Sequence, residues 1–288
     1  MCLAIEEPEL FQHPVQARAF ATVLRELAKD GSQGIQVAYA THSPFFLEAE
    51  GFAEVRRIAR EPIAGGEGNR ARIYSTTLRA IAERLDGIKS PEQVVKQLSG
   101  VFLKRLPEAL FADAVILVEG TTDQAILEGS ALRDDPLNAC GIVVVDAGGK
   151  AGIPLAHAIL EGLGVPCFVL FDGDAGAESR AAPGKGPEAR ESTAAANRKL
   201  LGYLGATVQD HPATTVTERW AVLEGTLEPV LNTWAAWVAK RRELIRDGRG
   251  LPDKDAATYR LAAREAEDAP PALLTTILES AKAISPDC

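Results

Sequence analysis

Residues 114–123 read AVILVEGTTD and residues 165–174 read VPCFVLFDGD, and these two stretches decide the fold. Each is an uninterrupted apolar run that ends in carboxylates, which is typical of a strand buried on both faces of a parallel sheet. A third such run, GIVVVD, occupies residues 141–146. Helical patterns follow at 122–132 and 152–162, and strands that alternate with helices predict a parallel α/β sheet.

Four carboxylates follow the ends of two of these runs. Glu119 and Asp123 stand four residues apart, and Asp172 and Asp174 flank a glycine. At the carboxyl edge of one sheet they would repel one another, by on the order of 4 kcal/mol for two like charges about 4 Å apart. Divalent cations relieve that repulsion, and hard oxygen ligands favour Mg²⁺ or Mn²⁺. A shared site requires Glu119 to lie within about 10 Å of the Asp172–Asp174 tip. The alternative is that each acid is an isolated, solvated residue.

A different set of polar residues marks the N-terminal segment. Glu6 and Glu7 end the apolar run of residues 2–5, and His42 follows the predicted strand 35–40. In nucleotide hydrolases such acids help to hold Mg²⁺ and orient the attacking water. The arrangement resembles the Walker B and switch-histidine motifs of ATP-binding-cassette (ABC) ATPases, although solvated acids at a strand exit would look the same. The chain has no G-x-x-x-x-G-K-[ST] loop, so we expect ATP to bind only in a longer parent polypeptide with an upstream ATPase portion.

The order of the motifs carries a further resemblance. ATPase-type motifs, then E-G-x-x-D, the Asp146–Lys150 turn and D-x-D, resemble the overcoming lysogenization defect (OLD) family of ATP-dependent nucleases, whose metal-binding module is a Toprim domain. The resemblance implies a metal-dependent endonuclease that hydrolyses DNA with two Mg²⁺ or Mn²⁺ ions. It also implies a site: the metal ligands Glu119, Asp123, Asp172, Asp174 and Glu224, with Glu228 as second choice for the last, and Asp172 and Lys254 as catalytic residues.

DNA binding requires positive charge, although the net charge of the chain is −9. A local basic stretch is sufficient for contacts with phosphates. The candidates are Arg56, Arg57 and Arg60; Arg70 and Arg72; and Lys240, Arg241, Arg242, Arg246 and Arg249. For each, a solvated face without a ligand is an equally good interpretation.

Two other functions fit parts of the pattern. Asp172-Gly173-Asp174 is similar to the D-x-D motif of haloacid-dehalogenase-type phosphohydrolases, in which the first aspartate is a nucleophile. That motif normally follows an early strand, whereas here it follows the third of its unit. The other alternative is a non-catalytic regulatory fragment of an ATPase, for which the acids would bind metal only weakly.

The whole chain of 288 residues is expected to have an α/β fold with a Toprim-type parallel sheet flanked by helices. We predict the C-terminal part of an ABC-type ATPase domain at 1–75, a helical linker at 76–110, the Toprim catalytic core at 111–215 and a helical C-terminal extension that contributes to the site at 216–288. The parent ATPases typically pair, which makes a homodimer a candidate assembly, although the sequence does not fix the oligomeric state. Four scattered cysteines, no signal peptide and no apolar stretch of about 18 residues predict a cytoplasmic protein without a membrane partner.

Overall fold

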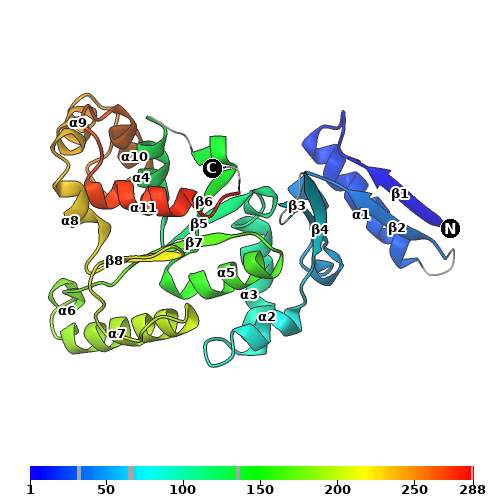
Figure 1. Cartoon of the computed structure of the whole chain (residues 1–288), viewed down its shortest axis with the longest axis horizontal. Coiled ribbons are helices and arrows are strands. Elements are labelled where there is room, and N and C mark those ends of the chain that lie inside the picture. The colour runs from blue at the N-terminus through cyan, green and yellow to red at the C-terminus, as the bar shows by residue number, and fades with distance from the viewer. Residues whose placement is uncertain (31–33, 64–67, 134–136, 287) are drawn as a thin grey trace.

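The apolar runs form a five-stranded sheet in the computed structural model of the chain, which describes residues 1–30, 34–63, 68–133, 137–286 and 288. The strand order is β6-β5-β7-β9-β8, and all neighbours are parallel except the last pair. The strands are β5 (Ala114–Val118), β6 (Ile142–Asp146), β7 (Cys167–Asp172), β8 (Thr215–Val216) and β9 (Trp220–Leu223). The predicted α/β fold with a mostly parallel sheet is confirmed (Figure 1).

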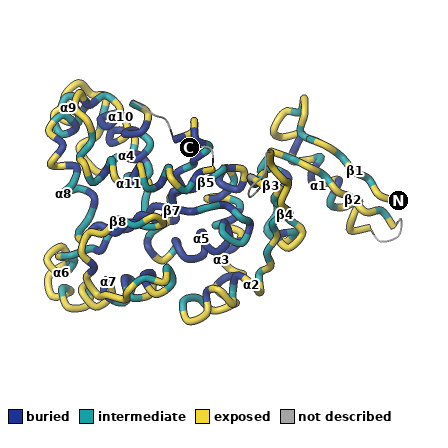
Figure 2. The backbone as a smooth tube through the Cα atoms, in the orientation of Figure 1, coloured by how far each residue is buried: buried dark blue, intermediate teal, exposed yellow. Residues whose placement is uncertain are grey.

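Helices cover both faces of this sheet, which explains why its central strands are apolar at every position (Figure 2). Along β5, Val115 and Leu117 pack into one core, whereas Ile116 and Val118 pack into a second core on the opposite face. The first core includes residues of α2 (Leu78–Arg84), α3 (Pro91–Lys104), α5 (Ile153–Gly162) and α7 (Gly186–Tyr203). The second includes residues of α4 (Thr121–Ala131), α8 (Leu227–Asn232), α9 (Ala235–Arg246), α10 (Ala256–Glu265) and α11 (Ala272–Lys282).

The N-terminal segment forms a smaller unit at one end of the molecule (Figure 1). Strands β1 (Cys2–Glu6) and β2 (Gln36–Ala40) pair in parallel, and α1 (Pro14–Lys29) joins them. His13 caps α1, whose buried residues Ala17, Ala21 and Leu24 pack with Phe46. The two strands alternate between exposed and half-buried residues, so β1 is not the fully buried strand that its apolar sequence predicts.

A β-hairpin connects this unit to the central sheet. It consists of β3 (Arg57–Pro62) and β4 (Asn69–Tyr74), as predicted, and most of its Gly-rich turn lies outside the described residues. The half-buried guanidinium of Arg57 donates hydrogen bonds to the carbonyls of Ala112 and Gly164, both at 2.9 Å. These carbonyls precede β5 and β7, so Arg57 ties the hairpin to the two strands that carry the predicted acids.

Three sequence expectations about the C-terminal half were wrong. Residues 206–209 are not a strand; β7 pairs with β5 on one side and with β9 on the other, and β9 is a four-residue run too short to show a period. The loop predicted at 173–190 contains α6 (Ala177–Arg180) and the start of α7. The helix predicted at 226–246 is interrupted near Trp234, whose indole donates to the carbonyl of Asp268. Short 3₁₀ turns complete the described elements: η1 (Pro44–Phe46), η2 (Phe52–Glu54), η3 (Ala109–Phe111), η4 (Leu137–Cys140) and η5 (Lys150–Gly152).

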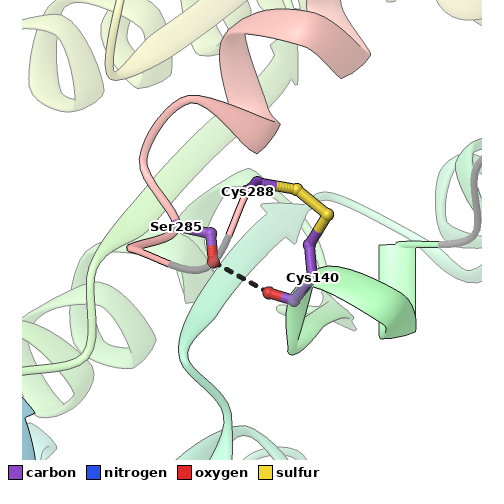
Figure 3. The surroundings of a disulfide bond; sticks show 3 residues. All are labelled: Cys140, Ser285 and Cys288. Carbon is purple, nitrogen blue, oxygen red and sulfur yellow. Dashed lines mark hydrogen bonds between the residues drawn. A yellow bond between two sulfur atoms is a disulfide. The ribbon is translucent and has the colours of Figure 1, made fainter.

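Two of the four cysteines are paired, although their spacing gave no sign of it. Cys140 and Cys288 form a disulfide between η4 and the end of the chain, with Cα atoms 5.1 Å apart (Figure 3). The hydroxyl of Ser285 donates a 2.8 Å hydrogen bond to the carbonyl of Cys140. This corner of the second core is therefore closed both covalently and by a buried polar contact.

Two expectations concern the chain as a whole. The predicted boundary at residue 215 stays a prediction, although β9 belongs to the same sheet as β5 and β7. No helix in the described ranges is both long and apolar enough to cross a bilayer.

Candidate functional site

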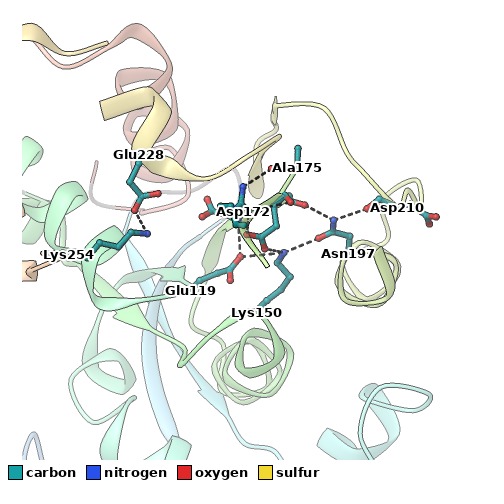
Figure 4. A network of polar contacts seen from close by, with 11 residues as sticks. Glu119, Lys150, Asp172, Ala175, Asn197, Asp210, Glu228 and Lys254 are labelled. Atoms are coloured by element: carbon teal, nitrogen blue, oxygen red, sulfur yellow. Dashed lines mark hydrogen bonds and ion pairs between the residues drawn. The ribbon is translucent and has the colours of Figure 1, made fainter. Parts of the chain in front are cut away.

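Glu119 and Asp172 meet at the carboxyl edge of the sheet (Figure 4). Glu119 follows β5, Asp172 ends β7, and these strands are parallel neighbours. The backbone N–H of Asp172 donates to Oε1 of Glu119 over 2.8 Å. This contact lies well inside the separation of about 10 Å that a shared two-ion site allows.

The turn after Asp172 is held against the end of β9. Asp174 has φ 58°, in the left-handed region, and its N–H donates to the carbonyl of Gly225 over 2.9 Å. A Cβ atom on Gly173 would lie only 2.7 Å from the carbonyl oxygen of Glu224 and 2.8 Å from that of Leu223. Only glycine allows this approach, and it brings the segment that follows β9 next to the two aspartates.

Asp123 lies in the first turn of α4, as predicted, and caps that helix. Its Oδ2 accepts a 3.0 Å hydrogen bond from the backbone N–H of Gly120. Burial raises the pKa of Asp123 to about 6, although this hydrogen bond acts in the opposite direction. The charge of Glu228 raises the pKa further. The charge of Asp123 therefore interacts with the other acids of the site, while its carboxylate accepts a hydrogen bond at the start of α4.

Of the two candidate acids after β9, Glu228 is the one that faces the cluster. It forms an ion pair with Lys254 (Figure 4), and its charge contributes to the raised pKa values of Asp123 and Asp172. Burial acts to raise the pKa of Glu228, but the hydrogen bonds from Lys254, Thr226 and the backbone, together with the charge of Lys254, outweigh it, so the pKa of Glu228 is lowered. Glu224 is exposed. The sequence ranked Glu224 ahead of Glu228; the contacts favour the reverse order.

Lys150 is the site residue that sequence reasoning missed. Its side chain is 9% exposed, and its Nζ lies 2.8 Å from Oδ2 of Asp174 and 3.8 Å from Oε1 of Glu119. It also donates to Oδ1 of the buried Asn197 over 3.0 Å, and the Asn197 amide donates to the carbonyls of Gly173 and Asp210. The one feature of the sequence that could have indicated Lys150 is its place in a Gly-Gly-Lys turn, between the two apolar runs that end in the predicted metal ligands. Lys150 is thus a buried cation held among the predicted acids.

The cluster suppresses the ionisation of its own carboxyl groups. Burial raises the pKa of Glu119 to about 7, although the nearby Lys150 ammonium acts to lower it. Burial, followed by the charges of Asp123, Glu119 and Asp174, raises the pKa of Asp172 to about 8. Strongly raised carboxyl pKa values in one cluster are typical of functional sites.

The donor set fits a hard divalent cation. Its predicted ligands are all carboxylates, and burial works against ionisation in three of them, Glu119, Asp123 and Asp172. Such oxygen ligands suit Mg²⁺ or Mn²⁺. In the part of the chain that the structure describes, no three His, Cys, Asp or Glu side chains form a ready-made metal cage. The Lys150 ammonium stands between Glu119 and Asp174 instead.

The predicted ATPase residues also come together, at the ends of β1 and β2. Nε2 of His42 lies 3.3 Å from Oε1 of Glu7, whereas Glu6 is exposed. Glu9, which the sequence did not single out, accepts hydrogen bonds from the Thr41 hydroxyl at 2.7 Å and the His42 N–H at 2.9 Å. The strand ends thus bring one acid and the histidine of the predicted motifs into contact.

Most of the predicted cationic stretches are internally paired. Arg70 and Arg72 bind Glu61, and Lys240 binds Glu243. Arg246 binds Asp247, and Arg249 binds Glu265. Arg56 and Arg241 donate to backbone carbonyls, as Arg57 does. These contacts favour the structural interpretation for eight of the ten side chains; among the described residues, Arg60 and Arg242 have no such contact.

A mostly parallel sheet with Glu119 and Asp123 after one strand, and Asp172 and Asp174 after its neighbour, defines a Toprim-type domain. Residues 110–174 match the family described as "Overcoming lysogenization defect protein-like, TOPRIM domain". Residues 1–47 match the AAA ATPase domain family. The chain therefore carries an OLD-like Toprim domain preceded by part of an ATPase domain, and the resemblance seen in the sequence is confirmed. The matched segment includes Asp172–Asp174, which assigns the D-x-D motif to Toprim and not to a dehalogenase-type phosphatase.

The chain is also similar to two curated proteins that are named as nucleases. The OLD nuclease of Thermus scotoductus is 35% identical over 172 residues, which are 59% of this chain and 30% of that protein. Endonuclease GajA of Bacillus cereus is 27% identical over 190 residues, 60% of this chain and 26% of that protein. A solved structure of the C-terminal region of the Xanthomonas campestris pv. campestris OLD protein is 21% identical, with a TM-score of 0.41 over 62% of this chain and 96% of that one. The chain spans less than a third of the length of the two curated relatives.

Proposed function

We propose that this chain is the catalytic portion of a divalent-metal-dependent DNA endonuclease that hydrolyses phosphodiester bonds. The observation that carries the proposal is the meeting of Glu119, Asp172 and Asp174 at one sheet edge. The similarity to proteins named OLD nuclease and endonuclease supports it.

The site residues have distinct roles in this proposal. Glu119, Asp172 and Asp174 hold one cation, and Asp123 with Glu228, or Glu224, holds the other. A pair of such ions supplies an activated water and stabilises the departing oxygen. The Lys254 side chain is 63% exposed, so it can leave Glu228 and offset negative charge on the phosphoryl oxygens.

The test of the proposal is nicking of supercoiled plasmid by the whole chain with 5 mM Mg²⁺ or Mn²⁺, roughly the concentration that weak sites require. We expect relaxed circles with either ion and none after addition of excess EDTA. Cleavage that persists in EDTA after dialysis would contradict a metal mechanism. Calorimetric titration with Mn²⁺ separates catalysis from the regulatory alternative, for which neither nicking nor saturable metal binding is expected.

Arg241 positions Lys254 through the loop that precedes α10. Its guanidinium donates to the carbonyls of Pro252 and Asp253 and lies over the ring of Tyr259, 5.2 Å from the centroid. We expect Arg241→Gln to reduce the nicking rate by roughly 10–100-fold, because small displacements of a catalytic group are costly.

The matched control is Arg242→Gln, at the exposed neighbouring position, which we expect to nick at the wild-type rate. If Arg241 acts through Lys254, the same substitution made in a Lys254→Gln background costs little. Fully additive losses in that double-mutant cycle would show that Arg241 acts elsewhere.

The other elements of the proposal concern the longer protein. Glu7 and His42 would contribute to a nucleotide site completed by an upstream ATPase portion, and ATP would act only there. DNA as the substrate, a homodimer and a cytoplasmic location stay predictions.

A further inference from the structure

A groove of about 670 Å³ runs along α3 beside the acidic site. Its walls carry four basic residues, and its lining contains no carboxylate. The basic residues are Lys89, Lys96, Lys104 and Arg105. A smaller hollow of about 410 Å³ continues from Lys104 and Arg105 along the edge strand β6. The smaller hollow also contains Glu108 and Asp146, so the cations predominate in the larger groove alone. In a chain with net charge −9, a concave surface whose charged lining residues are all cations favours an anionic occupant.

The lysines of this groove differ from the cations on α9. Lys89, Lys96 and Lys104 have no ion-pair partner among the residues that the structure describes, whereas Lys240, Arg246 and Arg249 each bind an acid. Burial and the charge of Lys199 lower the pKa of Lys89, which shows that positive charge accumulates here. A lysine without an ion-pair partner can bind an external anion at lower cost than a paired one, because no existing ion pair has to be broken.

The spacing along α3 suits a regular polyanion. Lys96, Gly100 and Lys104 follow one another at intervals of four residues, which places them on one face of the helix. Gly100 has no atom within 4 Å of the position that a Cβ would occupy, so the groove is open between the two lysines. The rise from Lys96 to Lys104 is about 12 Å. One strand of B-DNA carries three to four phosphates over about that axial length.

The groove and the acidic site border the same Gly148–Gly149 turn. Gly148 lines the groove, and the N–H of Gly149 donates to the carbonyl of Glu119 over 2.7 Å. The next residue, Lys150, points its side chain into the acidic cluster. Arg105 donates to the backbone carbonyl of Asp146 and to its Oδ2, both at 3.0 Å, and so lies at the carboxyl end of β6. One turn therefore borders both the cations and the predicted metal ligands.

We propose that this groove binds the sugar-phosphate backbone of duplex DNA and guides it to the acidic cluster. The proposal rests on the proposed nuclease function for the identity of the polyanion. Lys89, Lys96 and Lys104 contact separate phosphates, with those at Lys96 and Lys104 about three to four nucleotides apart on one strand. Arg105 marks the point where the backbone turns towards Glu119. Contacts of this kind fix the register of the duplex and read no bases.

The experiment is fluorescence anisotropy with the whole chain and a labelled 30-base-pair duplex, in EDTA so that no cleavage occurs, between about 50 and 200 mM KCl. For wild type we expect log K to fall with log[KCl] with a slope of about −3 to −4, since each neutralised phosphate contributes about 0.9. Lys96→Gln/Lys104→Gln should make the slope shallower by about two and weaken binding at 50 mM KCl by at least 10-fold.

The matched control is Arg246→Gln/Arg249→Gln, which also removes two exposed cations from a helix end. Its slope and affinity should equal those of wild type. The proposal that the groove binds DNA would be wrong if Lys96→Gln/Lys104→Gln bound DNA as tightly as wild type. It would also be wrong if Arg246→Gln/Arg249→Gln lost as much affinity as the α3 variant. Both variants should give the circular dichroism spectrum of the wild type, since Lys96 and Lys104 are exposed, as are Arg246 and Arg249. DNA binding is measured without metal, so the two proposals can fail separately. A chain that binds DNA through α3 but does not nick plasmid would contradict the proposed nuclease function and still support DNA binding by the groove.

Discussion

Asp172→Asn is expected to abolish metal-dependent nicking and, in the absence of metal, to stabilise the protein at pH 8. The activity should fall by on the order of 10³-fold, because the substitution removes a charged ligand that stabilises the transition state only through the bound ions. The free energy of unfolding in EDTA at pH 8 should rise by about 2 kcal/mol, or roughly 5 °C in Tm, since Asn carries no buried charge.

The pH dependence of stability has a definite sign. Burial raises the pKa of Asp172 to about 8 and that of Glu119 to about 7, whereas in the unfolded chain both lie near 4. Between these values the folded state binds more protons than the unfolded state, so stability falls as the pH rises from about 4 to 8. Asp172→Asn should reduce this loss of stability with rising pH. Mn²⁺ should also reduce the loss in wild type, because the cation binds the ionised carboxylates and releases protons.

Thermal denaturation in EDTA at pH 5.5 and pH 8 measures both effects. Glu188→Gln provides the control, because Glu188 is an exposed acid on α7 with one surface partner, Lys185. It should change neither the nicking rate nor the pH slope. An Asp172→Asn variant that nicks at the wild-type rate would remove Asp172 from the site, and one that is less stable than wild type at pH 8 would contradict the electrostatic account.

Lys150→Met is expected to destabilise the metal-free protein by about 3 kcal/mol, because it removes one partner from a buried ion-pair network. The ammonium contacts Asp174, Glu119 and Asn197, and no other cation in the described chain lies within 4 Å of Glu119. For a chain of this size the loss corresponds to roughly 6–12 °C in Tm. The destabilisation should be larger at pH 8 than at pH 5.5, because Glu119, whose pKa is about 7, is ionised at pH 8 and mostly protonated at pH 5.5.

Added Mn²⁺ should recover much of that loss, so the shift in Tm on adding metal should be greater for Lys150→Met than for wild type. Lys185→Met is the matched control, since it removes an exposed lysine paired with one acid, and its Tm should stay within about 2 °C of wild type. Equal Tm values for the two methionine variants would show that Lys150 does not compensate the acids.

The central strands and their acids could be predicted from sequence because their signals are local. The runs around Val115, Val144 and Val169 are buried on both faces, and the continuous apolar pattern reports that directly. Glu119 and Asp172 follow these runs immediately, and parallel strands must end at the same edge. The class of sheet therefore places the two acids at the same edge, and the pairing of β5 with β7 brings them into contact.

The role of Lys150, strand β9 and the orientation of Glu228 depend on contacts between distant parts of the chain, which a local sequence pattern does not reveal. Lys150 looks like a turn residue until β6 and β7 are placed on either side of β5, an order that brings its ammonium to Asp174 and Asn197. Strand β9 has only four residues, so its apolar run cannot be distinguished from the first turn of a helix. Glu228 was ranked second because the path of α8, which turns it towards Lys254, is set by packing in the second core.

The disulfide between Cys140 and Cys288 determines how proteolytic cleavage of this protein appears on a gel. The bridge spans 148 positions and encloses β6, β7, β9 and every helix after α4 in one covalent ring. A protease that cuts a single peptide bond inside the ring, for example in the exposed stretch around Pro183, opens the ring without separating the pieces. The nicked protein keeps its full mass on a gel until a thiol reductant is added, and then separates into two fragments.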